Sequence, residues 1–222
     1  SQKDFLWKNN GPSATTAGWT FTNVAARAGV DNGGQNQFGA AWGDYDGDGW
    51  LDLFLVGGTH HSLYHNSGNG TFTDVAMSAG LDDTNPSGYS VAWGDYDGDR
   101  DLDIYVTSGK TDFLYRNNGN GSFTNIMAEA GISESYNGMG AAWCDFDNDG
   151  DLDIFVASYS GQPNLLYRNN GDGSLSQVAE KVGITERRGS RGVAWGDFDN
   201  DGDFDLFVAA DQSQVGLLYR NN

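Results

Sequence analysis

FGAAWGDYDGDGWLDLFLV, residues 38–56, decides the fold of this chain, because its acidic centre and both apolar flanks return three more times. The acidic loops read DYDGDGWLD at 44–52, DYDGDRDLD at 95–103, DFDNDGDLD at 145–153 and DFDNDGDFD at 197–205. Each loop places carboxylates at positions 1, 3, 5 and 9 and, with one exception, a glycine at position 6. Such alternation wraps hard oxygen ligands around one ion, and Ca²⁺ takes about six to eight of them. The sequence therefore predicts up to four calcium sites, one in each repeat.

The flanks separate these acidic loops from EF-hands. An EF-hand loop lies between two helices and closes with Glu at position 12, whereas each loop here closes with Asp at position 9 and lies between β-prone runs. From the end of the first loop onward, Leu51, Leu53 and Leu55 alternate with Asp52, Phe54 and Val56, and beyond Asp52 the run is entirely apolar. Both faces of that run are apolar, which is typical of a strand buried on both sides. We expect a strand hairpin around each acidic loop.

Four tryptophans give the length of the repeat. Trp42, Trp93, Trp143 and Trp195 are 51, 50 and 52 residues apart, and a period near 50 residues indicates a propeller or a solenoid. Each repeat contains a small-residue strand, an acidic loop, an aliphatic strand, a variable link, a Leu-Tyr-x-Asn strand, a Gly-rich turn and an FTDVA-like strand. Four strands per repeat make a propeller blade, with the small-residue strand innermost. The sequence therefore predicts an all-β propeller of four-stranded antiparallel blades, a single domain over 1–222 with repeats at about 31–81, 82–132, 133–184 and 185–222.

The first 30 residues carry half a blade. FLWKNN at 5–10 matches the third strand and WTFTNVAARAGV at 19–30 the fourth, while the C-terminal LLYRNN is again a third strand. We expect residues 1–30 to close the ring, with 19–24 completing the last blade, although FLWKNN is then one strand too many. Three arrangements stay open: a closed four-blade ring, a piece of a longer propeller, and a homodimer that joins its open ends into a larger ring.

The hairpin DxDxDGxxD followed by LYRNNGxGxFTxVAxxAGI resembles the FG-GAP or VCBS type of repeat over nearly the whole chain. It is similar in particular to the propellers of the cartilage acidic protein family, and more distantly to integrin α-subunit propellers and fungal propeller lectins. The resemblance implies a secreted, calcium-loaded propeller for adhesion or recognition, in which calcium is structural. It implies carboxylate ligands at Asp44, Asp46, Asp48 and Asp52; Asp95, Asp97, Asp99 and Asp103; Asp145, Asp147, Asp149 and Asp153; and Asp197, Asp199, Asp201 and Asp205. The implied carbonyl ligands are those of Trp50, Asp101, Asp151 and Asp203.

The second loop departs from the pattern because Arg100 replaces the glycine at position 6. If that position needs a left-handed backbone, a side chain there costs about 1 kcal/mol. The guanidinium also lies beside four carboxylates and competes with an ion. We therefore predict that the second calcium site is the weakest of the four.

Composition limits the partners. The 31 acidic and 12 basic residues give a formal charge of −19, and four Ca²⁺ ions would add +8 and leave −11. This balance argues against nucleic acid and anionic membranes as partners, and no apolar run approaches the length of a membrane span. The single Cys144 forms no intrachain disulfide and is silent on compartment. We expect an extracellular location, because extracellular modules bind calcium at roughly 0.1–1 mM.

Three classes of function remain. The first is a binding or adhesion module, in which an extracellular protein or glycan contacts the variable loops. These loops are the links between the second and third strands at 57–61, 107–112, 157–163 and 209–215 and the blade-crossing segments at 31–37, 82–89, 133–139 and 185–191. In the second, a lectin, sugars stack on Tyr89, Tyr136 or Tyr159. The third is an enzyme, a polysaccharide lyase or hydrolase built on a propeller, which we do not expect because the obvious carboxylates belong to the cation sites. His60, His61 and His65 are most simply residues of an exposed polar link.

Overall fold

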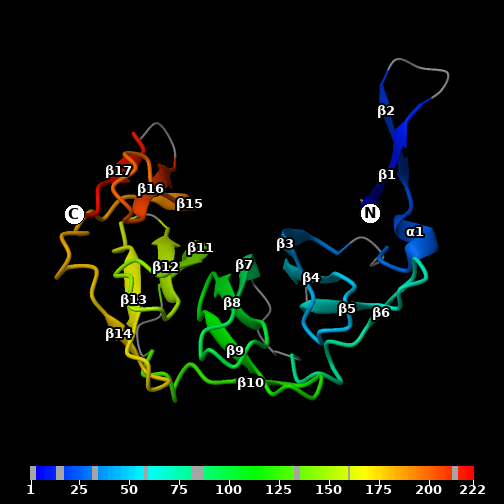
Figure 1. Cartoon of the computed structure of the whole chain (residues 1–222), viewed down its shortest axis with the longest axis horizontal. Helices are drawn as coiled ribbons and strands as arrows, with labels where there is room; N and C mark the ends of the chain where they lie inside the picture. The colour runs from blue at the N-terminus through cyan, green and yellow to red at the C-terminus, as the bar shows by residue number, and fades with distance from the viewer. Residues whose placement is uncertain are drawn as a thin grey trace.

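The computed structural model describes residues 4–13, 18–31, 35–57, 60–81, 88–132, 136–159, 161–211 and 215–222. Four antiparallel sheets follow one another around an open arc (Figure 1). The first three sheets have four strands each: β3 Gln37–Gly43, β4 Asp52–Gly57, β5 Ser62–Asn66 and β6 Phe72–Asp74; β7 Gly88–Gly94, β8 Asp103–Ser108, β9 Phe113–Asn117 and β10 Phe123–Asn125; β11 Gly138–Cys144, β12 Asp153–Ser158, β13 Leu165–Asn169 and β14 Leu175–Gln177. The fourth sheet has three: β15 Ser190–Gly196, β16 Asp205–Ala210 and β17 Leu217–Tyr219. The predicted all-β propeller architecture is confirmed.

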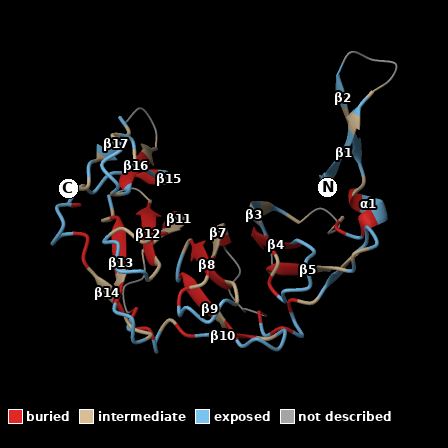
Figure 2. Cartoon of the chain, in the orientation of Figure 1, coloured by how far each residue is buried: buried red, intermediate tan, exposed pale blue. Residues whose placement is uncertain are grey.

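The strands take the places that their composition predicts. The small-residue strands β3, β7, β11 and β15 contact one another in succession and line the inner side of the arc. The aliphatic strands β4, β8 and β12 are buried along their whole length (Figure 2). Each of these strands has a neighbour on either side and large residues on both faces. For β8 and β12 both faces pack against neighbouring sheets, whereas Leu53 and Leu55 of β4 pack against Ala25, Ala28 and Val30, residues in and just after the short helix α1 (Ala25–Ala28).

Each blade repeats the same register. The tryptophan of the first strand pairs with an aliphatic residue of the second, and the paired positions are Trp42 with Leu53, Trp93 with Ile104, Trp143 with Ile154 and Trp195 with Leu206. The identical pairing shows that the four repeats are structurally equivalent, so a residue in one blade can be compared directly with its counterpart in another.

The core lies between blades. The Trp93 indole packs edge-on against Phe54 of the preceding blade at a centroid distance of 6.0 Å, and its Nε1 donates to the Ala41 carbonyl at 3.4 Å. Gly43 allows this approach, since a Cβ there would lie 2.9 Å from the Trp93 ring. A second link is the Asn117 amide, which donates to the Tyr45 carbonyl of the preceding blade at 2.8 Å.

The N-terminal half-blade differs from the expected ring closure. β1 (Trp7–Pro12) pairs with β2 (Trp19–Asn23), and the short helix α1 (Ala25–Ala28) follows. The Asn9–Phe21 pair repeats the Asn117–Phe123 pair of a complete blade, so β1 and β2 are third and fourth strands, as predicted. The prediction that 19–24 pairs with the last blade was wrong within this chain. β2 pairs with β1 instead, and the β1–β2 hairpin lies at the opposite end of the arc from β17 (Figure 1). Among the described residues, no helix has the length and apolarity to cross a membrane.

Candidate cation sites in the acidic loops

Each acidic loop joins the first and second strands of a blade and turns through two left-handed residues. At position 4, φ is 70° at Gly47, 76° at Gly98, 57° at Asn148 and 60° at Asn200. At position 6, φ is 89° at Gly49, 80° at Arg100, 97° at Gly150 and 99° at Gly202. Glycine and asparagine tolerate this conformation, which explains why they recur at these positions. Arg100 therefore adopts the left-handed backbone on which its predicted cost depends.

Backbone amides hold the carboxylates in one arrangement. The position-1 aspartate accepts a hydrogen bond from the amide of position 6, at 3.0 Å from Gly49 to Asp44 and 3.0 Å from Arg100 to Asp95. The position-5 aspartate accepts from position 7, as in the 2.8 Å bond from Trp50 to Asp48. In the last three loops the position-1 aspartates, Asp95, Asp145 and Asp197, accept a further backbone hydrogen bond on their second oxygen. These bonds shape the loop as a turn.

The position-9 aspartate anchors the loop to the blade. Asp52 is fully buried, and its two carboxylate oxygens accept from the backbone amides of Tyr45 at 3.2 Å and Asn66 at 2.7 Å. The same pair of bonds holds Asp103, Asp153 and Asp205. One carboxylate thus connects the acidic loop to the start of the second strand and to the third strand.

The loops gather carboxylates to within 4.8 Å of one another. The clusters are Asp44, Asp46 and Asp52; Asp95, Asp97 and Asp99; Asp145, Asp147 and Asp153; and Asp197, Asp199 and Asp205. The first, third and fourth clusters join positions 1, 3 and 9, whereas the second joins positions 1, 3 and 5. Every cluster consists of residues that the sequence singled out, and each offers only hard oxygen donors, which could hold a cation.

Burial disfavours the ionised form of the position-9 aspartates in these loops. Burial raises the pKa of Asp103 to about 7 and that of Asp153 to about 6, against the lowering effect of their backbone hydrogen bonds. Burial also raises the pKa of Asp52 above its usual range. A buried carboxylate beside other carboxylates is stabilised most directly by a bound cation, which reverses this electrostatic balance.

The third strand contributes a basic side chain that sequence reasoning missed. Arg168 donates from Nε to Asp147 and from Nη2 to Asp149 at 2.9 Å. Arg220 pairs in the same way with Asp199 at 2.6 Å and Asp201 at 3.2 Å. The recurring Leu-Tyr-Arg-Asn pattern carried this signal, because the arginine immediately precedes the asparagine whose backbone amide binds the position-9 aspartate. These arginines engage the oxygens at positions 3 and 5 that an ion would use.

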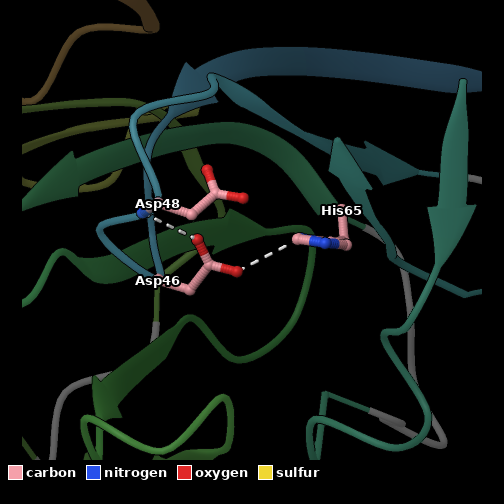
Figure 3. Close-up of side chains that lie close together, drawn as sticks. All are labelled: Asp46, Asp48 and His65. Atoms are coloured by element: carbon pink, nitrogen blue, oxygen red, sulfur yellow. Dashed lines mark hydrogen bonds and ion pairs between the residues drawn. The ribbon is translucent and has the colours of Figure 1, made fainter. Parts of the chain in front are cut away.

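The first blade has His65 in place of that arginine (Figure 3). Its Nδ1 lies 3.1 Å from Asp46 Oδ2 and 3.5 Å from Asp52 Oδ1, and Asp46, Asp48 and His65 form a cluster with all donor atoms within 4.8 Å. The first loop therefore has an imidazole rather than a guanidinium beside its carboxylates. His65 belongs to a strand that faces the loop and not to the exposed polar link in which the sequence placed it.

His61 also corrects the sequence interpretation. Its side chain is buried and packs against Phe54 and Phe113 at centroid distances of 5.8 and 6.1 Å. Burial lowers its pKa to about 4. His61 is therefore a neutral part of the core between the first two blades.

The three tyrosines considered for sugar stacking have different surroundings. Tyr136 packs against the core between the second and third blades, and Tyr89 lies against Phe38 at 5.6 Å. Tyr159 lies under the guanidinium of Arg191, whose Cζ is 5.7 Å from the ring centroid. Arg191 is held by Asp211 through a 2.7 Å bond. Of these three tyrosines, Tyr159 is the one whose ring lies against a cationic side chain, that of Arg191, at the boundary between the third and fourth blades.

One similar solved structure supports the propeller fold, and a second one matches less closely. A lectin of Agrocybe aegerita, described by its specific recognition of non-reducing terminal N-acetylglucosamine, matches with a TM-score of 0.53 at 20% identity, over 92% of this chain and 54% of that one. The Photorhabdus luminescens Tc holotoxin pore matches with a TM-score of 0.48 at 19% identity, over 90% of this chain and 10% of that one. At these identities the likeness to the lectin concerns the fold alone.

Comparisons of sequence point to one family. Cartilage acidic protein 1 of Mus musculus is 52% identical over 42 residues, and that of Homo sapiens 50% over 42 residues, in each case 19% of this chain. The match spans only 6% of the length of these curated relatives. The model of the FG-GAP-like repeat matches residues 44–106, 95–156 and 145–208, which together cover well over half of the chain and include all four acidic loops. The chain belongs to the FG-GAP-like repeat family.

Proposed function

We propose that this chain is a calcium-binding propeller segment that acts as an extracellular recognition module, with the ions serving as structural supports. The observation that carries the proposal is the gathering of aspartate oxygens to within 4.8 Å in all four acidic loops. Carboxylate and carbonyl oxygens are the ligands that Ca²⁺ prefers, and their flexible spacing suits it better than Mg²⁺, which demands near-octahedral geometry. In each loop the carboxylates of positions 1, 3, 5 and 9 and the carbonyl of position 7 would hold the ion.

The position of each loop supports a structural role for calcium. The ion would neutralise the repulsion between carboxylates and fix the turn between the first and second strands of a blade. Because the position-9 aspartate also binds the third strand, as Asp52 binds the amide of Asn66 at 2.7 Å, the ion would tie three strands together. Recognition is then left to the links and blade-crossing segments on this rigid scaffold.

Calorimetric titration tests the metal assignment. We expect up to four Ca²⁺ ions per chain, little competition from Mg²⁺, and the loss of one ion in Asp44→Ala. Glu129→Gln, which removes an exposed acid outside the loops, is the matched control and should leave the stoichiometry unchanged. Absence of calcium binding in the wild-type chain at millimolar concentration would refute the proposal.

A carbohydrate ligand is the second candidate, and the Tyr159–Arg191 pair favours it. An aromatic ring with a cation and a carboxylate beside it can stack on a sugar and bind its hydroxyls, and aromatic rings suit such half-exposed contacts. The similar Agrocybe lectin gives N-acetylglucosamine-terminated glycans as the probe. Binding on a glycan array that is lost in Tyr159→Ala would support a lectin, whereas a blank array would leave a protein as the partner of the module.

A further inference from the structure

The first blade differs from the others in the side chain that its third strand places beside the acidic loop. The third strands read LYHN at 63–66, LYRN at 114–117, LYRN at 166–169 and LYRN at 218–221. In the third and fourth blades the arginine forms ion pairs with the aspartates at loop positions 3 and 5. In the first blade His65 lies beside the aspartates at the same two positions, Asp46 and Asp48 (Figure 3). A guanidinium offers no lone pair to a metal ion, whereas imidazole is the commonest metal ligand.

The donor atoms beside the first loop have the spacing of ligands around one ion. The Nδ1 atom of His65 lies 3.1 Å from Asp46 Oδ2, and one ligand atom from each of Asp46, Asp48 and His65 lies within 4.8 Å of the other two. Ligands held about 2.0–2.1 Å from a tetrahedral zinc ion lie about 3.3 Å from one another. Asp52 Oδ1, which is 3.5 Å from the same nitrogen, is a fourth donor. One imidazole and three carboxylates thus share one small volume beside β5.

Two atoms of this site are inaccessible to solvent and make no hydrogen bond within the described residues. They are Nδ1 of His65 and Oδ1 of Asp44. The other carboxylate oxygen of Asp44 accepts from the amide of Gly49 at 3.0 Å, so the loop leaves one oxygen unused. Buried polar atoms nearly always have a partner, and a bound ion supplies one where the protein does not. A cation between the imidazole and the loop would satisfy the nitrogen of His65.

The sheet holds two of these donors in place. His65 pairs with Thr73 of β6, and its ring lies edge-on against the buried ring of Tyr45 at a centroid distance of 6.3 Å. Asp52 is fixed by the backbone amides of Tyr45 and Asn66. Donors on paired strands keep their geometry more precisely than donors on loops. The strands therefore fix one side of the site, and the acidic loop supplies the other side.

We propose that the first blade binds one zinc ion through Asp46, Asp48 and His65, with Asp52 as the fourth ligand. Zinc takes imidazole and carboxylate ligands in a tetrahedral set, whereas calcium takes oxygen ligands. The ion connects β5 to the acidic loop, a connection that ion pairs of arginine make in the third and fourth blades. Because Asp46 and Asp48 are also proposed calcium ligands, the first loop holds either zinc or calcium, and the other three loops hold calcium.

Titration of the tag-free chain with Co²⁺ and Zn²⁺ in millimolar calcium tests the assignment. We expect one tight site in the wild-type chain, with the visible absorption of four-coordinate Co²⁺, which Zn²⁺ then abolishes. His65→Arg gives the first blade the residue of the other three. This variant should lose at least about tenfold in affinity, since loss of even an outer-shell partner of a metal ligand costs roughly 10- to 100-fold. His60→Ala removes a neighbouring histidine outside the site and is the matched control, which should bind as wild type does.

A gain of function tests whether this one position decides the metal. Arg168 pairs with Asp147 and Asp149 in the third blade, as His65 lies beside Asp46 and Asp48 in the first. We expect Arg168→His to bind two Co²⁺ ions, and the double variant His65→Arg with Arg168→His to bind one. A wild-type chain without the Co²⁺ absorption, equal binding by wild type and His65→Arg, or no second ion in Arg168→His would overturn the proposal.

The exchange of zinc for calcium in the first loop rests on the proposed function and is measured separately. With zinc bound, the calcium stoichiometry of the wild-type chain should fall by one, and that of His65→Arg should not change. Full calcium binding without zinc uptake would overturn the zinc site and leave the proposed function standing. Zinc uptake without any calcium binding would support the zinc site and refute the proposed function.

Discussion

At the scale of single residues, the acidic loops show how one backbone requirement selects an amino acid. Position 6 is left-handed in all four loops, and three of them use glycine there. Arg100 is the exception, with φ of 80°. An L-residue in this region is strained by roughly 1 kcal/mol relative to glycine, so the second loop bears a cost that the other three avoid.

Arg100→Gly should therefore strengthen the second site. We expect the free energy of unfolding to rise by about 1 kcal/mol and the weakest calcium dissociation constant in a calorimetric titration to decrease, because both the strain and the competing guanidinium are removed. Gly150→Arg in the third loop is the reciprocal variant and should create a weak site. Four equal affinities in the wild-type chain would contradict the prediction.

The third-strand side chain that lies against each acidic loop should set the order of calcium affinity among the first, third and fourth sites. Arg168 must release Asp147 and Asp149 before both carboxylates can turn to an ion, whereas the first loop has His65 at this position. His65→Arg should weaken calcium binding at the first site by about two- to fivefold, the magnitude expected of a surface ion pair. Arg168→His should strengthen the third site by a similar factor. Affinities unchanged in both variants would show that these pairs do not compete with the ion.

At the scale of elements, the link between the second and third strands of a blade is held by one buried side chain. In the second blade, Asp112 accepts hydrogen bonds from the Ser108 amide at 2.7 Å and from the Tyr105 hydroxyl at 3.1 Å. In the third blade, Asn164 accepts from the Ser158 amide at 3.0 Å. The same link is thus fastened by a carboxyl group in one blade and by an amide in the next.

This difference predicts a pH effect confined to the second blade. Burial raises the pKa of Asp112 from 3.8 to about 7, so the folded chain prefers the protonated form. The stabilising contribution is fully present below the unfolded pKa near 4 and is lost as pH rises through about 7. Between these limits wild type should lose at most about 4 kcal/mol relative to Asp112→Asn.

Chemical denaturation at a series of pH values in excess calcium measures this difference. Asn164→Asp should introduce a similar loss of stability into the third blade, because that position is equally buried. Comparison of each variant with wild type at the same pH cancels the titration of the other carboxylates. A difference between wild type and Asp112→Asn that does not change with pH would contradict the prediction.

At the scale of the whole molecule, the described arc is stabilised by boundaries that resemble one another and by loops that concentrate negative charge. A formal charge of −19 favours expansion of the chain, and much of it lies in the four acidic loops. Ions bound in those loops would lower this repulsion and hold each blade in the shape that its neighbour needs. Local metal binding would in this way affect the stability of every boundary.

Removal of calcium should therefore lower the melting temperature markedly. An ion at 100 times its dissociation constant stabilises the folded state by about 2.7 kcal/mol per independent site. We expect a large decrease in melting temperature on addition of a chelator, and Asp197→Ala should reproduce part of it. Differential scanning calorimetry measures both effects, and Glu129→Gln should respond to the chelator as wild type does. A melting temperature that is indifferent to the chelator would exclude a structural role for calcium.

The sequence by itself determined the repeat, the order of strands and the composition of the acidic loops. These features depend on local chemistry: alternating apolar residues form a buried strand, glycine permits a left-handed turn, and the spacing of aspartates directs their oxygens inward. The position of Trp93 against Phe54 could be anticipated for the same reason, because aromatic residues that recur once per blade mark the boundary between blades.

Only the tertiary structure decided which residues meet across the chain and how the arc ends. The approach of His65 to Asp46 and the burial of His61 depend on the pairing of the third strand with the second, which no local pattern encodes. The pairing of β2 with β1 instead of β17 depends on which edge lies nearest in space. Equivalent strands have nearly the same local sequence, so the sequence specifies the type of partner that each edge accepts, and the three-dimensional arrangement selects among them.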